Sequence, residues 1–155
     1  MNSDAIVEAA MKYEGFASMR YRNRDMGKDP SGFDCSGFVL FVLLQVGFPI
    51  SQEVRHCNQF FDRFGVLVHP DLHKKGDLVF FSRNGYCPNH MGIMISNDRY
   101  IHSPGKADRR VIVSHLKMTS LVPRIRARTE QIYNKNPIGF KRPAILNGRF
   151  HKMIK

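Results

Sequence analysis

One cysteine stands where a helix is expected to begin. Cys35 follows Asp34, a good N-cap residue, and precedes the apolar run 38–44, which predicts a buried helix ending near Gly47. A thiol in the first turn of a helix lies near unpaired backbone N–H groups and the positive end of the helix dipole, which favour the thiolate. Free cysteines are more often simply buried, so this position alone leaves two alternatives, nucleophile and packing residue.

Two histidines occupy the ends of predicted strands further along the chain. His90 opens one strand and His102 ends the next, and the turn at 97–98 joins them, so antiparallel pairing brings both to one end of a sheet. If the helix of Cys35 packs there, Cys35 would be the nucleophile, His90 its general base and His102 the group that orients the His90 ring. The predicted elements place no catalytic partner beside the other histidines, so we interpret them as surface or packing residues: His56, His69, His73, His115 and His151.

The elements that must position these groups follow from the periodicity. Apolar spacing predicts helices over 3–13, 35–47 and 51–64, and β-prone runs predict strands over 77–82, 91–96, 99–102, 110–114 and 138–142. The polar segment 21–33 predicts a loop, and 116–136 is ambiguous. Helices followed by an antiparallel meander indicate an α+β domain, with N-terminal helices packed on a central sheet of about five strands.

The length of 155 residues fits one domain, which we place at 1–145, followed by a basic tail at 146–155. The formal net charge of +11 favours an anionic partner: nucleic acid, an anionic membrane surface, or an acidic polymer such as cell wall. Zinc-finger spacing and an aromatic RNA-binding signature are both absent from the sequence, so no specific nucleic-acid reader is expected.

The sequence contains no run of about 20 apolar residues, the length that a transmembrane helix needs. The first residues do not resemble a signal peptide. We therefore expect a protein that stays in the cytoplasm or reaches the wall by a route without a signal peptide.

The three cysteines cannot form a complete disulfide framework, although Cys57 and Cys87 are free to pair. An alternative is zinc bound by Cys87 and His90 together with His102 or Cys57. Structural zinc usually needs two close ligand pairs, and the sequence offers one. We therefore expect no metal and no cofactor.

Four motifs in order give the chain a family resemblance. Residues 32–39 match a nucleophile motif, 75–81 a core strand, 90–93 a base motif and 100–103 a third-residue motif, with the second histidine twelve positions after the first. In these motifs the chain resembles the NlpC-type cysteine peptidases, which cleave bacterial peptidoglycan peptides. The resemblance runs from about residue 21 to 114, and less closely to 142.

The resemblance implies a papain-like α+β fold and amide hydrolysis through a thioester acyl-enzyme, with the Cys35 backbone N–H in an oxyanion hole. The family's usual bond joins γ-D-glutamate to a diamino acid, often meso-diaminopimelate. It also implies a set of substrate-binding residues: Tyr21, Asp34, Ser36 and Ser103. Residues 21–25 depart from the family's Tyr-x-Gly-Gly pattern, so Tyr13 stays an alternative to Tyr21 as the substrate-side tyrosine.

Two other readings of the same residues stay open. One is a related thiol amidase or acyltransferase that acts on another amide. The other is a non-catalytic domain that binds wall or a partner protein, although such a domain has no need of Cys35, His90 and His102 together. If the protein is a secreted effector, an immunity or delivery protein would be a further partner.

Overall fold

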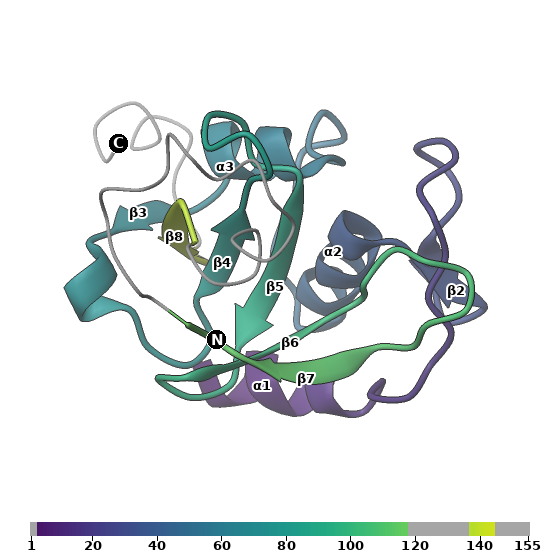
Figure 1. Ribbon diagram of the computed structural model, residues 1–155, viewed down its shortest axis with the longest axis horizontal. Coiled ribbons are helices and arrows are strands. Elements are labelled where there is room, and N and C mark those ends of the chain that lie inside the picture. The colour runs from purple at the N-terminus through teal and green to yellow at the C-terminus, as the bar shows by residue number, and fades with distance from the viewer. Residues whose placement is uncertain (1–2, 118–136, 145–155) are drawn as a thin grey trace.

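The computed structural model describes residues 3–117 and 137–144 (Figure 1). In these ranges three α-helices, α1 Ser3–Met11, α2 Cys35–Gln45 and α3 Cys57–Arg63, accompany a six-stranded sheet. Neighbouring strands of this sheet are all antiparallel. The α+β architecture expected from the sequence is confirmed.

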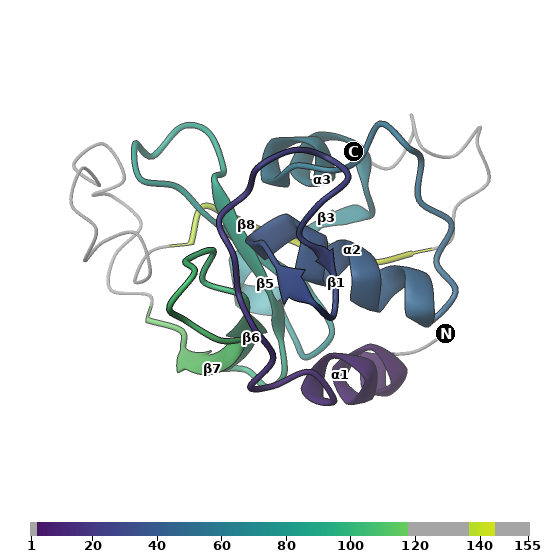
Figure 2. The ribbon, with the colours of Figure 1, turned by 90° about the vertical axis from the view of Figure 1, so that its right-hand side faces the viewer.

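The sequence of α2 explains where this helix starts and stops. The Asp34 carboxylate accepts a hydrogen bond from the Gly37 amide at 2.7 Å, which makes Asp34 the N-cap. Most of the apolar residues that follow are buried, because α2 packs against both α1 and the sheet (Figure 2). At the other end Gly47 adopts a φ of +94°, which is easy for glycine, and its amide bonds the Leu44 carbonyl at 3.0 Å.

The sheet has the strand order β3 Val66–Val68, β8 Gly139–Arg142, β4 Leu78–Phe81, β5 His90–Met94, β6 Arg99–His102 and β7 Ile112–His115. Every residue of the central strands β4 and β5 is buried. Alternate residues of these strands divide the core into a larger cluster shared with the helices and a smaller cluster on the opposite face. The register sets Phe81 opposite His90 and Ile93 opposite Ile101, which fixes the ends of β5 and β6 relative to each other.

Three local features differ from the sequence prediction. Helix α3 begins at Cys57 rather than at Ser51, because 51–54 forms a turn and the buried Arg55 side chain bonds to other segments. Strand β3 is a sixth strand at the sheet edge, and its three residues are too few to show a period. The predicted loop 21–33 contains a small hairpin of β1 Lys28–Asp29 and β2 Gly32–Phe33.

No helix in the described ranges is long and apolar enough to cross a bilayer. The predicted basic tail 146–155, and all but the first two residues of the ambiguous segment 116–136, lie outside the described residues.

Candidate active site

Cys35 is the first residue of α2 and lies, half-buried, in the wall of a cavity of about 290 Å³. Four separate segments line this cavity: Tyr21, Asp34 to Ser36, His56 to Asn58, and Pro88 with Asn89. The start of a helix leaves its first backbone N–H groups without intrahelical acceptors, so the Cys35 sulphur lies where negative charge is favoured. Because Cys35 borders this cavity, a ligand can reach its sulphur, and the helix start favours the thiolate there.

The two predicted histidines lie together at one end of the sheet. Nε2 of His90 is 2.7 Å from Nδ1 of His102, and both side chains are buried. His102 falls one register step beyond the Ile93–Ile101 pair, which puts it opposite Gly92. A β-carbon at Gly92 would lie 3.0 Å from Cβ of His102 and 2.9 Å from the Ile101 carbonyl oxygen, so the glycine leaves the His102 ring its space.

Ser114 completes a line of polar groups that begins at Cys35. Its Oγ lies 3.0 Å from Nε2 of His102 and comes from β7, the neighbour of β6. Burial, and then the charge of His90, lowers the pKa of His102 well below its usual value, so this ring is neutral at pH 7. When Nδ1 of His102 accepts a hydrogen bond from His90, its Nε2–H must donate to Ser114. The Ser114 hydroxyl can accept this bond, so it is compatible with the tautomer in which Nδ1 of His102 accepts from His90.

The surroundings of Cys35 favour its thiolate. The pKa of Cys35 lies well below its usual value, because a hydrogen bond from Cys57, then the bond and charge of the His90 imidazole, and the Ser36 amide together outweigh the effect of burial. The Cys35 and Cys57 sulphurs are 3.5 Å apart. The same hydrogen bond, with burial, raises the pKa of Cys57 well above its usual value. Cys35 is therefore the thiolate of the pair, and Cys57 is the donor.

A buried arginine holds the segments around the start of α2. The Arg55 guanidinium bonds both Asp34 carboxylate oxygens at 2.6 and 3.1 Å and Oγ of Ser36 at 2.9 Å. It also donates to the carbonyls of Met26 at 2.6 Å and Arg24 at 2.8 Å. These bonds use all five N–H groups of an arginine side chain. Nothing in the local sequence marks Arg55, because an arginine four residues into the predicted helix 51–64 forms no cap and no apolar period.

Tyr21 and His56 both line the cavity of Cys35. The Tyr21 hydroxyl is 3.3 Å from Nε2 of His56, and the two rings meet edge-on with centroids 4.6 Å apart. Tyr21 thus lines the cavity of Cys35, whereas Tyr13 bonds Gln45 and packs on the rings around α2. His56, which the sequence led us to interpret as a surface or packing residue, packs on Tyr21 and also lines the cavity of Cys35.

Three of the residues expected to bind substrate bond to neighbouring segments of the protein through their side chains. Asp34 and Ser36 are buried, and their side chains are occupied by Arg55. Ser103 is fully buried, and its Oγ lies 2.7 Å from both Oγ of Ser18 and the Phe33 carbonyl oxygen. These bonds give all three side chains partners within the protein, while Asp34 and Ser36 also line the cavity of Cys35.

The three cysteines are all free, and the proposed partner of Cys87 faces elsewhere. Cys57 lies against Cys35, whereas Cys87 is exposed. Within the described ranges, no three His, Cys, Asp or Glu side chains gather as a metal site would require. His90, which the zinc alternative needed, is bonded to His102 instead.

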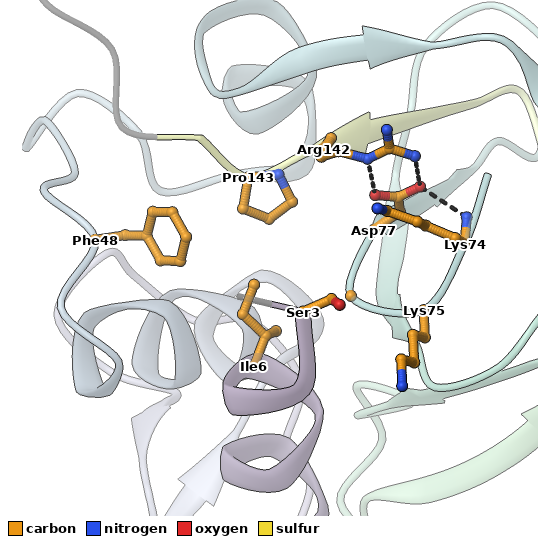
Figure 3. A pocket seen from close by; sticks show the side chains of 9 residues that line it. Ser3, Ile6, Phe48, Lys74, Lys75, Asp77, Arg142 and Pro143 are labelled. Atoms are coloured by element: carbon orange, nitrogen blue, oxygen red, sulfur yellow. Dashed lines mark hydrogen bonds and ion pairs between the residues drawn. The ribbon is translucent and has the colours of Figure 1, made fainter. Parts of the chain in front are cut away.

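A second pocket, of about 240 Å³, lies beside the start of α1 (Figure 3). The charged groups of this pocket are bonded to each other. Arg142 donates to the Asp77 carboxylate at 2.8 and 3.0 Å, and the Lys74 backbone amide donates to the same carboxylate at 2.9 Å. Lys75, also at this pocket, pairs with Asp4 at 2.5 Å. No cysteine or histidine lines it, whereas Cys35, Cys57 and His56 line the cavity of Cys35.

The chain is similar in sequence and fold to known proteins. Residues 21–130 match the model of the NlpC/P60 family. Protein P54 of Enterococcus faecium is 36% identical over 110 residues, which are 67% of this chain and 18% of P54. A gamma-D-glutamyl-L-lysine dipeptidyl-peptidase of Bacillus cereus (strain ATCC 10987 / NRS 248) is 33% identical over 87 residues, which are 55% of this chain and 25% of that protein. The chain thus spans a quarter or less of these two relatives.

The crystal structure of the NlpC/p60 domain of the peptidoglycan hydrolase SagA aligns with a TM-score of 0.64 at 30% identity. The alignment covers 91% of this chain and 98% of that domain. Since the family model matches well over half of the residues and the fold agrees with a solved member, the chain belongs to the NlpC/P60 family of papain-like cysteine peptidases.

Proposed function

We propose that this protein is a cysteine endopeptidase that hydrolyses peptidoglycan stem peptides through a thioester acyl-enzyme at Cys35. The observation that carries the proposal is the line of groups from the Cys35 thiol through His90 and His102 to Ser114. A domain that only binds wall or a partner protein has no need of a stabilised thiolate beside two oriented imidazoles. An enzyme that attacks an amide needs both.

In the proposed reaction the Cys35 thiolate attacks the carbonyl carbon, and a C–S bond forms. The backbone N–H of Cys35, at the start of α2, supports the developing oxyanion. His90 gives its proton to the leaving amine as the C–N bond breaks, which leaves a thioester. His90 then takes a proton from water as the water attacks the thioester, and Cys35 is released as thiolate. His102, neutral because it is buried, keeps the His90 ring in place throughout.

The bond that we propose joins γ-D-glutamate to a diamino acid, such as meso-diaminopimelate. Support comes from the relative whose name specifies a gamma-D-glutamyl-L-lysine bond, and from the net charge of +11, which suits an anionic wall. Tyr21, His56 and Asn58 line the cavity with groups able to bond the polar ends of a stem peptide.

The test is cleavage of defined muropeptides, with products identified by mass spectrometry. The proposal expects scission after the γ-D-glutamyl residue, and it expects Cys35→Ala to yield no product while keeping its circular dichroism spectrum. Cys87→Ser is the matched control, because Cys87 is an exposed cysteine outside the cavity and its loss should change nothing. His90→Ala should lower kcat by about 10²–10⁴-fold, as loss of a general base does, and His102→Ala by less. Cleavage by Cys35→Ala at the parental rate would contradict the nucleophile assignment.

Two further measurements separate the alternatives. An added amine acceptor distinguishes an acyltransferase, which would yield a new amide product, from a hydrolase, which yields the free acid. Iodoacetamide labelling at pH 7 distinguishes an enzyme from a binding domain, since the thiolate of Cys35 should react before Cys87 does. A protein that neither cleaves muropeptides nor labels preferentially at Cys35 would be a binding domain.

A further inference from the structure

A second thiol lies against the proposed nucleophile. The Cys57 sulphur is 3.5 Å from the Cys35 sulphur, and both residues line the same cavity. They come from the first residues of two different helices, α3 and α2, which are 22 positions apart in the chain. Hydrolysis of an amide needs one sulphur, so the catalytic steps leave Cys57 without a covalent task.

The geometry is close to that of a covalent pair. A disulfide needs its sulphurs at about 2.05 Å, so these two, at 3.5 Å, must approach by about 1.5 Å. We propose that Cys57 is a resolving thiol, which captures oxidised Cys35 in a reversible Cys35–Cys57 disulfide and so switches the enzyme off. The switching rests on the proposed role of Cys35 as nucleophile, whereas formation of the disulfide does not.

The oxidant class that we propose is a peroxide. The Cys35 thiolate attacks one peroxide oxygen, an S–O bond forms, the O–O bond breaks, and the released hydroxide takes up a proton to become water. The Cys57 sulphur then attacks the Cys35 sulphur, so that an S–S bond forms, the S–O bond breaks, and the hydroxyl leaves with the Cys57 proton as a second water. Two thiols and one hydrogen peroxide thus give one disulfide and two waters, with the sulphurs oxidised and the peroxide reduced.

The environments of the two thiols give each of them one role. Cys35 is half-buried at the cavity and its pKa is lowered, so it is the thiolate that a peroxide meets first. Cys57 is 5% exposed and keeps its proton, so it is shielded from direct oxidation until the sulfenic acid forms beside it. Cys87 is exposed and does not line the cavity, which makes it a reference thiol of the same chain.

Peptide mapping tests the disulfide directly, without any activity measurement. Trypsin separates the three cysteines into peptides 29–55, 56–63 and 84–99. After treatment with one equivalent of hydrogen peroxide, the proposal expects a linked species of 29–55 and 56–63, lighter than the two peptides together by two hydrogens and separated by dithiothreitol. A linkage through 84–99 instead, or direct conversion of Cys35 to the sulfinic acid in the parent chain, would overturn the proposal.

Variants then test the protective role. Cys57→Ser keeps a hydrogen-bond donor beside Cys35 but cannot form a disulfide, and Cys87→Ser is the matched control that leaves the pair intact. Each variant is oxidised, treated with dithiothreitol and compared with its own untreated activity on muropeptides. We expect parent and Cys87→Ser to recover about tenfold more of their activity than Cys57→Ser, whose Cys35 passes to the irreversible sulfinic acid. Equal recovery by Cys57→Ser would overturn the protective role. If no variant cleaves muropeptides but the linked peptide still forms, the proposed function fails and the disulfide stands.

Discussion

Replacement of Arg55 by alanine should remove more stability than any other exchange of a charged residue around the site. The side chains of Arg55 and Asp34 are each 2% exposed, and their closest atoms are 2.6 Å apart. Removing one partner of such a buried pair costs about 3–5 kcal/mol, because the other charge stays buried without compensation. Folded domains are stable by only about 5–15 kcal/mol, so the loss is a large share of the free energy of unfolding.

The loss should also depend on pH, with a definite sign. Burial raises the pKa of Asp34, while its bonds to Arg55 oppose that effect. Without the guanidinium the pKa of Asp34 rises further, so the folded variant takes up a proton before its unfolded form does. A proton that binds the folded state more tightly stabilises it as the pH falls. The deficit of Arg55→Ala relative to the parent should therefore shrink between pH 7 and pH 5.

Urea unfolding, followed by circular dichroism at both pH values, measures this free energy. Arg63→Ala is the matched control, since Arg63 pairs with Glu53 at 3.1 Å but the two side chains are 54% and 72% exposed. Such an exposed pair contributes about 0–1 kcal/mol. Arg55→Lys, which keeps the charge but replaces five N–H donors by three, should fall between parent and alanine variant. If Arg55→Ala loses no more stability than Arg63→Ala, then the bonds of Arg55 to the segments around the start of α2 are not what stabilises the site.

Three further predictions concern the polar line and the helix start. Ser114→Ala should lower kcat about fivefold, the equivalent of one hydrogen bond of about 1 kcal/mol, and leave KM unchanged. Ser114→Thr, which keeps the hydroxyl, should restore kcat. A change confined to KM would contradict the positioning role of Ser114. The lowered pKa of His102 means that its unfolded form is protonated first, so the free energy of unfolding should fall below about pH 6.5 by up to about 1.4 kcal/mol per unit. His102→Gln should flatten this dependence in urea titrations, and an unchanged slope would show that His102 is not buried neutral. Gly37→Ala should lower the free energy of unfolding by about 1–3 kcal/mol in the same assay, because the new β-carbon would overlap the Gly27 carbonyl oxygen. A loss under about 0.5 kcal/mol would show that this contact is not tight.

Local sequence determined much of the candidate site. Asp34 caps α2 with its own carboxylate, and the apolar run behind Cys35 can only be buried, so the thiol had to stand at a helix start. The turn between β5 and β6 similarly had to bring His90 and His102 to one end of a sheet. Helix caps, turns and the spacing of apolar residues each depend on a few neighbouring residues, so they can be predicted from the sequence.

Tertiary structure alone decided which side chains surround that centre. Arg55 meets Asp34 across 21 positions, Cys57 meets Cys35 across 22, and Ser114 meets His102 from a neighbouring strand. None of the three belongs to a cap or a periodic face that would mark it in the sequence. Their contacts exist because segments far apart in the chain pack together and bury polar groups, which must then bond to whatever lies beside them. The local sequence thus determined where the Cys35 thiol and the two imidazoles lie. Tertiary packing determined that Arg55, Cys57 and Ser114 lie beside them.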